Sequence, residues 1–235
     1  MTIHHKFKKL GRPNLLVIFQ SANSHLYKAE NSNKFEYEGT FLKQEYDVPS
    51  CDYLFVKDGC VLDKSKGWYI SPNEGVDYMR NFLLEQKSKY NKIIATGFSS
   101  GGFASILFGS LCEFDLVLAL SPQTILYELD PNKPHIPKST RLNNFVNPGL
   151  SDTYLDCEPY INNFTKYYLH SCCKKKYDEC SYTDRLHHFV HIERLNHFDN
   201  VDIVYIERLI HVNNADSTRV GHLSPDLFRV IIMSL

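Results

Sequence analysis

Short apolar runs recur along the chain, and stretches with helical spacing separate them. Each run is rich in β-branched or aromatic residues and has the length of a strand. Three of the runs are almost continuously apolar, which is typical of parallel strands covered on both faces. We expect six strands: Leu15 to Phe19, Tyr53 to Val56, Ile93 to Gly97, Leu116 to Ser121, Lys166 to His170 and Val201 to Ile206.

The stretches between the runs place apolar residues three or four positions apart, which is the period of an amphipathic helix. One such stripe lies between Asn73 and Tyr90. Further helices are expected from Ser100 through Leu107, from Tyr182 to Leu195 and from Pro225 to about Met233. Strands that alternate with helices predict right-handed crossovers. The pattern therefore indicates a doubly wound α/β fold, with a mostly parallel sheet of about six strands and helices on both faces.

Residues 122–164 break this alternation. They hold six of the ten prolines of the chain, together with many Asn and Asp residues. Such a density of proline prevents a long regular helix, and long ordered loops often serve function. We therefore expect an inserted lid or cap at residues 122–164, within a single domain that spans residues 1–235.

Composition and charge narrow the class of protein. The chain has 235 residues, of which 43% are hydrophobic and 23% charged, as in an ordinary globular protein. Its formal net charge of −1 gives no reason to expect a nucleic-acid partner. No apolar run approaches the roughly 20 residues of a membrane span. The basic N-terminus lacks the apolar region of a secretory signal, so we expect a cytoplasmic protein.

The cysteines and glycines argue against a metal or cofactor. Seven cysteines are an odd number at irregular spacing, so we expect reduced thiols. Cys172, Cys173 and Cys180 lie near His187 and His188, but their spacing fits no usual zinc pattern. Glycine-rich phosphate-binding loops are missing from the sequence. We expect no cofactor and no metal.

The clearest chemical signal is a G-x-S-x-G motif. Residues 97–102 read Gly-Phe-Ser-Ser-Gly-Gly, directly after a predicted strand and at the start of a predicted helix. A serine on a tight turn between strand and helix projects its hydroxyl only if its neighbours have no side chains that clash. The alternative is a glycine turn in which Ser99 only caps the helix. The motif in this setting favours Ser99 as a nucleophile over Ser100.

On this motif the chain resembles the α/β-hydrolase superfamily, from Leu15 to the C-terminus. The resemblance implies an oxyanion hole built from two backbone N–H groups. One would belong to Ser100, the residue after the nucleophile. The other would come from the loop after the first predicted strand, where Ser21 and Ala22 both qualify.

The resemblance also implies that an acid and then a histidine follow the nucleophile along the chain. His222 lies after the last predicted strand and just before the terminal helix, where the superfamily has its catalytic histidine; His211 is the alternative. The acid should follow the strand that ends at His170. Asp184 and Asp178 both qualify, and Asp184 is slightly favoured although it also suits a helix N-terminus.

Two classes of function follow from these residues. The first is a serine esterase that forms an acyl-enzyme, acting on a small-molecule or carbohydrate ester; a thioesterase or an acyltransferase would use the same triad. A loose similarity to α/β-hydrolase-like proteins of bacterial surface-polysaccharide and glycosylation systems suggests an O-acetyl or other O-acyl carbohydrate substrate. The second is a non-catalytic accessory or binding protein that keeps the motif as architecture. Oligomeric state leaves no mark on the sequence.

Overall fold

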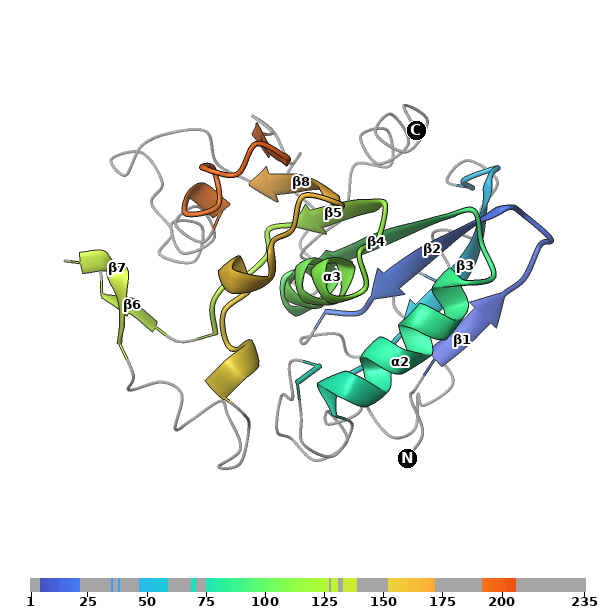
Figure 1. Ribbon diagram of the computed structural model, residues 1–235, viewed down its shortest axis with the longest axis horizontal. Coiled ribbons are helices and arrows are strands. Elements are labelled where there is room, and N and C mark those ends of the chain that lie inside the picture. Colours follow the sequence, from blue (N-terminus) through green and yellow to red (C-terminus); the bar gives the residue numbers. More distant parts are fainter. Residues whose placement is uncertain are drawn as a thin grey trace, which may run out of the picture.

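A seven-stranded sheet forms the centre of the molecule (Figure 1). The computed structural model describes residues 5–21, 35, 38, 47–58, 69–70, 75–126, 128–130, 133–138, 152–171 and 192–205. The strand order is β1-β3-β2-β4-β5-β8-β9, and every neighbouring pair is parallel except β1 with β3. The strands are β1 (His5–Lys8), β2 (Asn14–Phe19), β3 (Cys51–Val56), β4 (Lys92–Phe98), β5 (Leu116–Leu120), β8 (Lys166–Ser171) and β9 (Val201–Tyr205).

The sheet confirms the α/β prediction and adds one strand to it. All six predicted strands are present, with boundaries within two residues of those expected. The seventh, β1, is an edge strand of sequence His-Lys-Phe-Lys whose residues are mostly exposed. Charged residues are typical of sheet edges because they discourage pairing with other chains.

Two helices cover one face of the sheet (Figure 1). Helix α2 (Val76–Lys87) buries Val76, Met79 and Leu83, as its stripe predicts. Helix α3 (Ser100–Leu111) is buried over almost its whole length, and Phe108 stacks on Phe19 of β2 with ring centroids 5.8 Å apart. The predicted helix 182–195 is described only from residue 192, and the predicted helix 225–233 lies outside the described residues.

The other face of the sheet is also buried. Its side chains alternate with those that face α3, as successive residues of a strand must. They form a second apolar cluster: Leu16, Ile18, Phe35, Val48, Cys51, Tyr53, Phe55, Ile94, Leu116, Leu118 and Leu120. A sheet buried on both faces explains why these strands read as continuous apolar runs.

The described parts of residues 122–164 fall into two kinds. Strands β6 (Glu128–Asp130) and β7 (Lys133–Lys138) pair only with each other, as a separate two-stranded sheet (Figure 1). The 3₁₀ helices η5 (Asp152–Tyr154) and η6 (Glu158–Tyr160) belong to a stretch that runs along α3.

Residues 152–165 contact α3 near both ends of the helix. The fully buried thiol of Cys157 lies 3.8 Å from the carbonyl oxygen of Phe103, and Asn162 donates to the carbonyl of Ser110 at 2.7 Å. Arg194, just before β9, forms a bidentate ion pair with Asp156 and a further ion pair with Glu158. This stretch therefore packs as part of the core.

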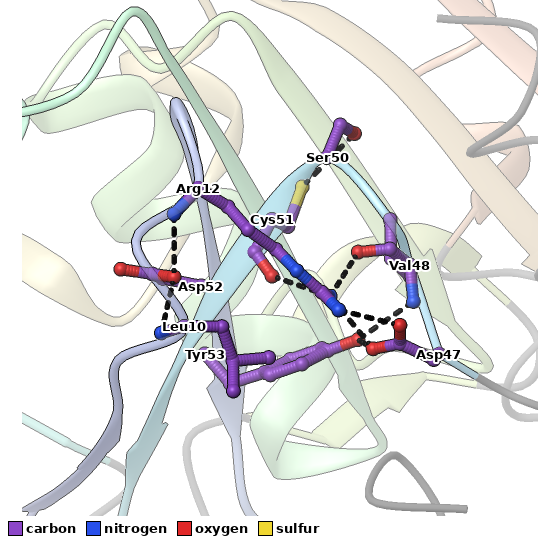
Figure 2. Close-up of polar contacts among 8 residues, drawn as sticks. All are labelled: Leu10, Arg12, Asp47, Val48, Ser50, Cys51, Asp52 and Tyr53. Carbon is purple, nitrogen blue, oxygen red and sulfur yellow. Dashed lines mark hydrogen bonds and ion pairs between the residues drawn. The ribbon is translucent and has the colours of Figure 1, made fainter. Parts of the chain in front are cut away.

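A polar cluster joins the loops at the amino ends of β2 and β3 (Figure 2). The guanidinium of Arg12 donates to both carboxylate oxygens of Asp47, at 2.7 and 2.6 Å, and to the carbonyl of Val48 at 2.7 Å. The hydroxyl of Tyr53 donates to the same carboxylate at 2.7 Å. Asp52 accepts the backbone N–H groups of Leu10 and Arg12.

Two further findings concern the described residues only. None of their helices is long and apolar enough to cross a membrane. The described cysteines, Cys51, Cys112 and Cys157, are buried free thiols.

Candidate active site

Buried polar residues gather at the carboxyl ends of the strands. Because neighbouring parallel strands end at the same edge, their following residues meet there, and α/β proteins bind ligands at this edge. The buried polar residues at or just beyond these strand ends are Gln20, Ser21, Lys57, Asp58, Ser100, Ser121 and His170. This edge is the candidate site.

Ser99 forms the turn between β4 and α3, near the middle of this edge. Its φ of 54° and ψ of −117° lie in a region that side chains disfavour, at a cost of about 1–3 kcal/mol. The surrounding backbone holds it there: the N–H of Ser99 donates to the carbonyl of Leu120 at 3.0 Å, and its own carbonyl accepts the N–H of Phe103 at 3.0 Å. The tight turn that the motif predicts between strand and helix is therefore present and strained, and the role of Ser99 as a nucleophile stays a prediction.

Two glycines allow this turn to form. A Cβ on Gly97 would lie 2.4 Å from the carbonyl carbon of Gly101, and a Cβ on Gly101 would lie 2.2 Å from the carbonyl oxygen of Phe19. Both contacts are with backbone, which cannot swing aside as a side chain can. The first turn of α3 is thus pressed directly against the end of β2.

The N-terminus of α3 supplies donors beside Ser99. The N–H of Phe103 is the first in α3 that donates to a carbonyl of the preceding turn, that of Ser99. The N–H groups of Ser100 and of the two glycines after it therefore have no acceptor within the helix. The helix dipole adds partial positive charge at the same point. If Ser99 attacks a carbonyl group, the oxyanion that forms on the carbonyl oxygen would lie near both these N–H groups and this positive charge.

The end of β2 lies next to this helix terminus. The N–H of Gln20 donates to the carbonyl of Val56 at 3.1 Å, which extends the sheet by one residue and leaves this group unable to serve an oxyanion. Ser21 follows and is 7% exposed. Ala22, the other predicted donor, lies outside the described residues.

The hydroxyl of Ser99 donates to Oε1 of Gln123, at 3.2 Å. Gln123 follows β5, and its role could not be anticipated from the sequence because no motif surrounds it. A carboxamide is too weak a base to remove the serine proton near neutral pH. This hydrogen bond therefore orients the hydroxyl without activating it.

The predicted proton-transfer partners all lie outside the described residues: His222, the alternative His211, Asp184 and the alternative Asp178. The strands that precede them are described. Strands β8 and β9 follow β5 in the sheet order and end at the same edge as Ser99. The roles of these four residues stay predictions.

His170 is a second residue that no sequence motif marks. It is the last residue but one of β8, lies beside Leu120 and is 2% exposed, and neither of its ring nitrogens has a hydrogen-bond partner among the described residues. Burial lowers its pKa to about 4, because a charged imidazolium is poorly solvated there. It is therefore neutral near pH 7. The available signal was its position inside a predicted buried strand.

The described residues offer no evident metal site, since no three His, Cys, Asp or Glu side chains among them gather closely enough to hold an ion. The predicted chemistry needs none. A serine nucleophile, a base and backbone donors suffice for acyl transfer.

Several solved structures share this fold. A variant of the capsule O-acetyltransferase of Neisseria meningitidis serogroup A in complex with CoA is 18% identical, with a TM-score of 0.61 over 97% of this chain and 90% of that one. A Staphylococcus aureus protein of unknown function is 10% identical, with a TM-score of 0.59 over 98% and 92% of the two chains. The Francisella virulence factor BioJ is 15% identical, with a TM-score of 0.56 over 97% and 77%.

These similarities and the elbow identify the fold as α/β-hydrolase-like. No family model matches the chain, and no curated protein matches it in sequence. At identities of 10–18%, the structural similarity shows the fold alone.

Proposed function

We propose that the protein is a serine esterase or acyltransferase that works through an acyl-enzyme on Ser99. The observation that carries this proposal is the backbone of Ser99, held at a φ of 54° at the start of a buried helix. Strained residues of this kind cluster at active sites, and the strain is unnecessary for a serine that only caps a helix. The adjacent helix N–H groups suit the oxyanion of acyl transfer.

The reaction would proceed in two steps. The Ser99 oxygen attacks the ester carbonyl while His222 takes its proton, and the N–H groups of Ser100 and of Ser21 or Ala22 bind the oxyanion. His222 then returns the proton to the leaving alcohol. In the second step, water or another alcohol gives its proton to His222 and attacks the acyl-enzyme. His222 then passes that proton to the Ser99 oxygen as the bond between the acyl group and Ser99 breaks. Asp184, or alternatively Asp178, orients the histidine.

We propose a carbohydrate O-acyl ester, in particular an O-acetyl ester, as the substrate class. Similarity over almost the whole chain to a capsule O-acetyltransferase supports this choice and favours the acyltransferase variant over the thioesterase. Hydrolysis and transfer share the acyl-enzyme and differ only in which nucleophile reaches it. The cytoplasmic location and the lack of a cofactor are part of the same proposal.

The test is the turnover of 4-nitrophenyl acetate by purified protein. We expect wild type to release 4-nitrophenol with a burst that matches the enzyme concentration, and Ser99→Ala to abolish the burst. Ser88→Ala, an exposed serine at the end of α2, is the control and should behave as wild type. Folded wild type without turnover would favour a non-catalytic accessory protein.

The acid is identified by separate substitutions. Asp184→Asn should lower kcat about 10³–10⁴-fold, whereas Asp178→Asn should have little effect. The reverse result would make Asp178 the triad acid. Comparable kcat in both variants and in wild type would remove the triad from the proposal.

A further inference from the structure

Gln123 lies on a backbone segment that is fixed on both sides. The N–H of Ser121 donates to the carbonyl of His170 at 2.8 Å, and the carbonyl of Thr124 accepts the N–H of Cys157 at 2.8 Å. Ile125 forms an isolated antiparallel bridge with Asp156. A φ of 41° at Ser121 turns the chain sharply after β5. The position of Gln123 is thus set before any substrate binds.

The side chain of Gln123 is the accessible one in this segment. Ser121, Pro122, Thr124 and Ile125 are all buried, whereas Gln123 is half-buried. Its Oε1 accepts the Ser99 hydroxyl at 3.2 Å. A group this close to the Ser99 oxygen is within reach of whatever is joined to that oxygen during the reaction.

The strand order decides which part of the substrate Gln123 would meet. Strand β4 lies between β2 and β5, so the loop after β2 and the segment of Gln123 flank Ser99 on opposite sides. The oxyanion donors belong to the β2 side and to the start of α3. Strand β9, which precedes the proposed histidine, lies beyond β5. The histidine exchanges its proton with the alcohol oxygen, so that oxygen faces the β5 side.

From this arrangement, and resting on the proposed function, we propose that Gln123 binds the alcohol portion of the substrate and selects alcohols that carry a hydroxyl beside the reacting one. Its carboxamide offers two N–H donors and one acceptor. When Ser99 becomes acylated it loses its hydroxyl proton, so Oε1 of Gln123 loses its partner and is free for a ligand. A polyhydroxy alcohol satisfies both ends of the carboxamide. A simple alcohol leaves them unpaired, which disfavours it.

The test measures how the acetyl group of the acyl-enzyme is divided between two competing acceptor alcohols. The donor is 4-nitrophenyl acetate, the acceptors are methyl glucoside and methanol, and the acetylated products are quantified by mass spectrometry. Gln123→Met keeps the side-chain length and removes its hydrogen-bonding groups. Gln86→Met is the matched control, a buried glutamine on α2 with a carbonyl of its own helix as partner.

We expect wild type to transfer acetyl to methyl glucoside in preference to methanol. Gln123→Met should lower the ratio of acetylated methyl glucoside to methyl acetate about tenfold, the effect of one lost hydrogen bond, because slower acylation of Ser99 would affect both products equally. Equal losses with both acceptors, no loss with either, or a wild-type preference for methanol would each overturn the inference. Wild type that releases no 4-nitrophenol would instead overturn the proposed function beneath it.

Discussion

At the scale of single residues, the turn at Ser99 can form only because Gly97 and Gly101 have no side chains. Gly97 and Gly101 lie where any Cβ would overlap backbone of the neighbouring turn or of β2. The strain at Ser99 persists because this close packing and two hydrogen bonds hold its backbone on both sides. A side chain at either glycine would push the first turn of α3 away from the end of β2, and the oxyanion donors with it.

Gly101→Ala should therefore lower the free energy of unfolding by about 3 kcal/mol or more. Gly11→Ala is the comparison: Gly11 has a φ of 75°, but a Cβ added there would meet no atom within 4 Å, so only backbone strain of about 1–2 kcal/mol applies. Urea unfolding of both variants measures the difference. Equal losses of stability would show that the contact with β2 is not tight.

The buried histidine predicts a pH dependence of stability. The pKa of His170 is about 4 in the folded protein and about 6.5 when unfolded, so the unfolded chain binds the proton more readily. Its contribution to stability is complete above pH 6.5 and is lost as the pH falls toward 4. Between pH 7 and pH 4.5 the loss should be about 2–3 kcal/mol.

His170→Met removes this titration and keeps a side chain of similar volume. The stability difference between pH 7 and pH 4.5 should shrink by the same amount in the variant, measured by urea unfolding at both values. If wild type and His170→Met lose equal stability, His170 is not held in its neutral form.

The sequence marks some residues of the candidate site and not others, for a physical reason. Ser99 was found because the requirements of its turn, two glycines at fixed spacing, are local. Gln123 was missed because its contact with Ser99 exists only once β5 lies beside β4. The same limit applies to His170. Its ring is buried without a hydrogen-bond partner among the described residues only because the strands around it pack together.

At the scale of elements, the burial of a strand determines whether the hydrophobic pattern of the sequence predicts it. The four strands β3, β2, β4 and β5 are buried along almost their whole length on both faces, so their apolar runs stand out in the sequence. Strand β1 has a single apolar residue, Phe7, and is held by pairing with β3 rather than by its own composition. Strand β7 contains Pro134 and Pro137, which ordinarily argue against a strand and are tolerated at an edge.

The Arg12 cluster is the element-scale feature with the clearest energetic consequence (Figure 2). Hydrogen bonds from Arg12 lower the pKa of Asp47, which shows that the pair favours its charged form. Arg12→Met leaves that carboxylate without its counter-charge and should cost about 2–3 kcal/mol of stability. Turnover by the folded variant should be unchanged, because the cluster lies at the amino ends of the strands, opposite Ser99.

The exposed pair of Lys89 and Glu85 on the surface at the end of α2 provides the control. Lys89→Met should change stability by less than about 0.5 kcal/mol, as expected of a solvated i,i+4 pair. Comparable losses in the two variants would mean that the Arg12 cluster is no more than a surface ion pair. A loss of turnover in folded Arg12→Met would place the site elsewhere.

At the scale of the whole molecule, the two ends of the sheet have different tasks. The amino ends of β2 and β3 are joined by ion pairs and hydrogen bonds that involve no strained residue in the described loops. The carboxyl ends carry Ser99 and Ser121, two of the described non-glycine residues with positive φ, whereas a third, Glu113, lies in the turn before β5. They also carry the buried side chains of Gln20 and His170, which have no hydrogen-bond partner among the described residues. Stability and proposed chemistry are thus separated along the strand direction.

The expected lid can be tested against this division. The β6–β7 hairpin pairs only with itself, whereas residues 152–165 pack on α3. Replacing residues 128–138 with a short Gly-Ser linker should change stability by less than about 1 kcal/mol and alter the relative rates on acetyl esters of different alcohols. If thermal melting shows that the variant no longer unfolds cooperatively, the hairpin is part of the core.

Labelling with a fluorophosphonate probe tests whether Ser99 is an activated nucleophile, as we propose. Intact-protein mass spectrometry should show one adduct per chain in wild type, located on Ser99, absent in Ser99→Ala and strongly reduced in His222→Ala. No adduct on folded wild type, or an adduct that persists in Ser99→Ala, would contradict the account.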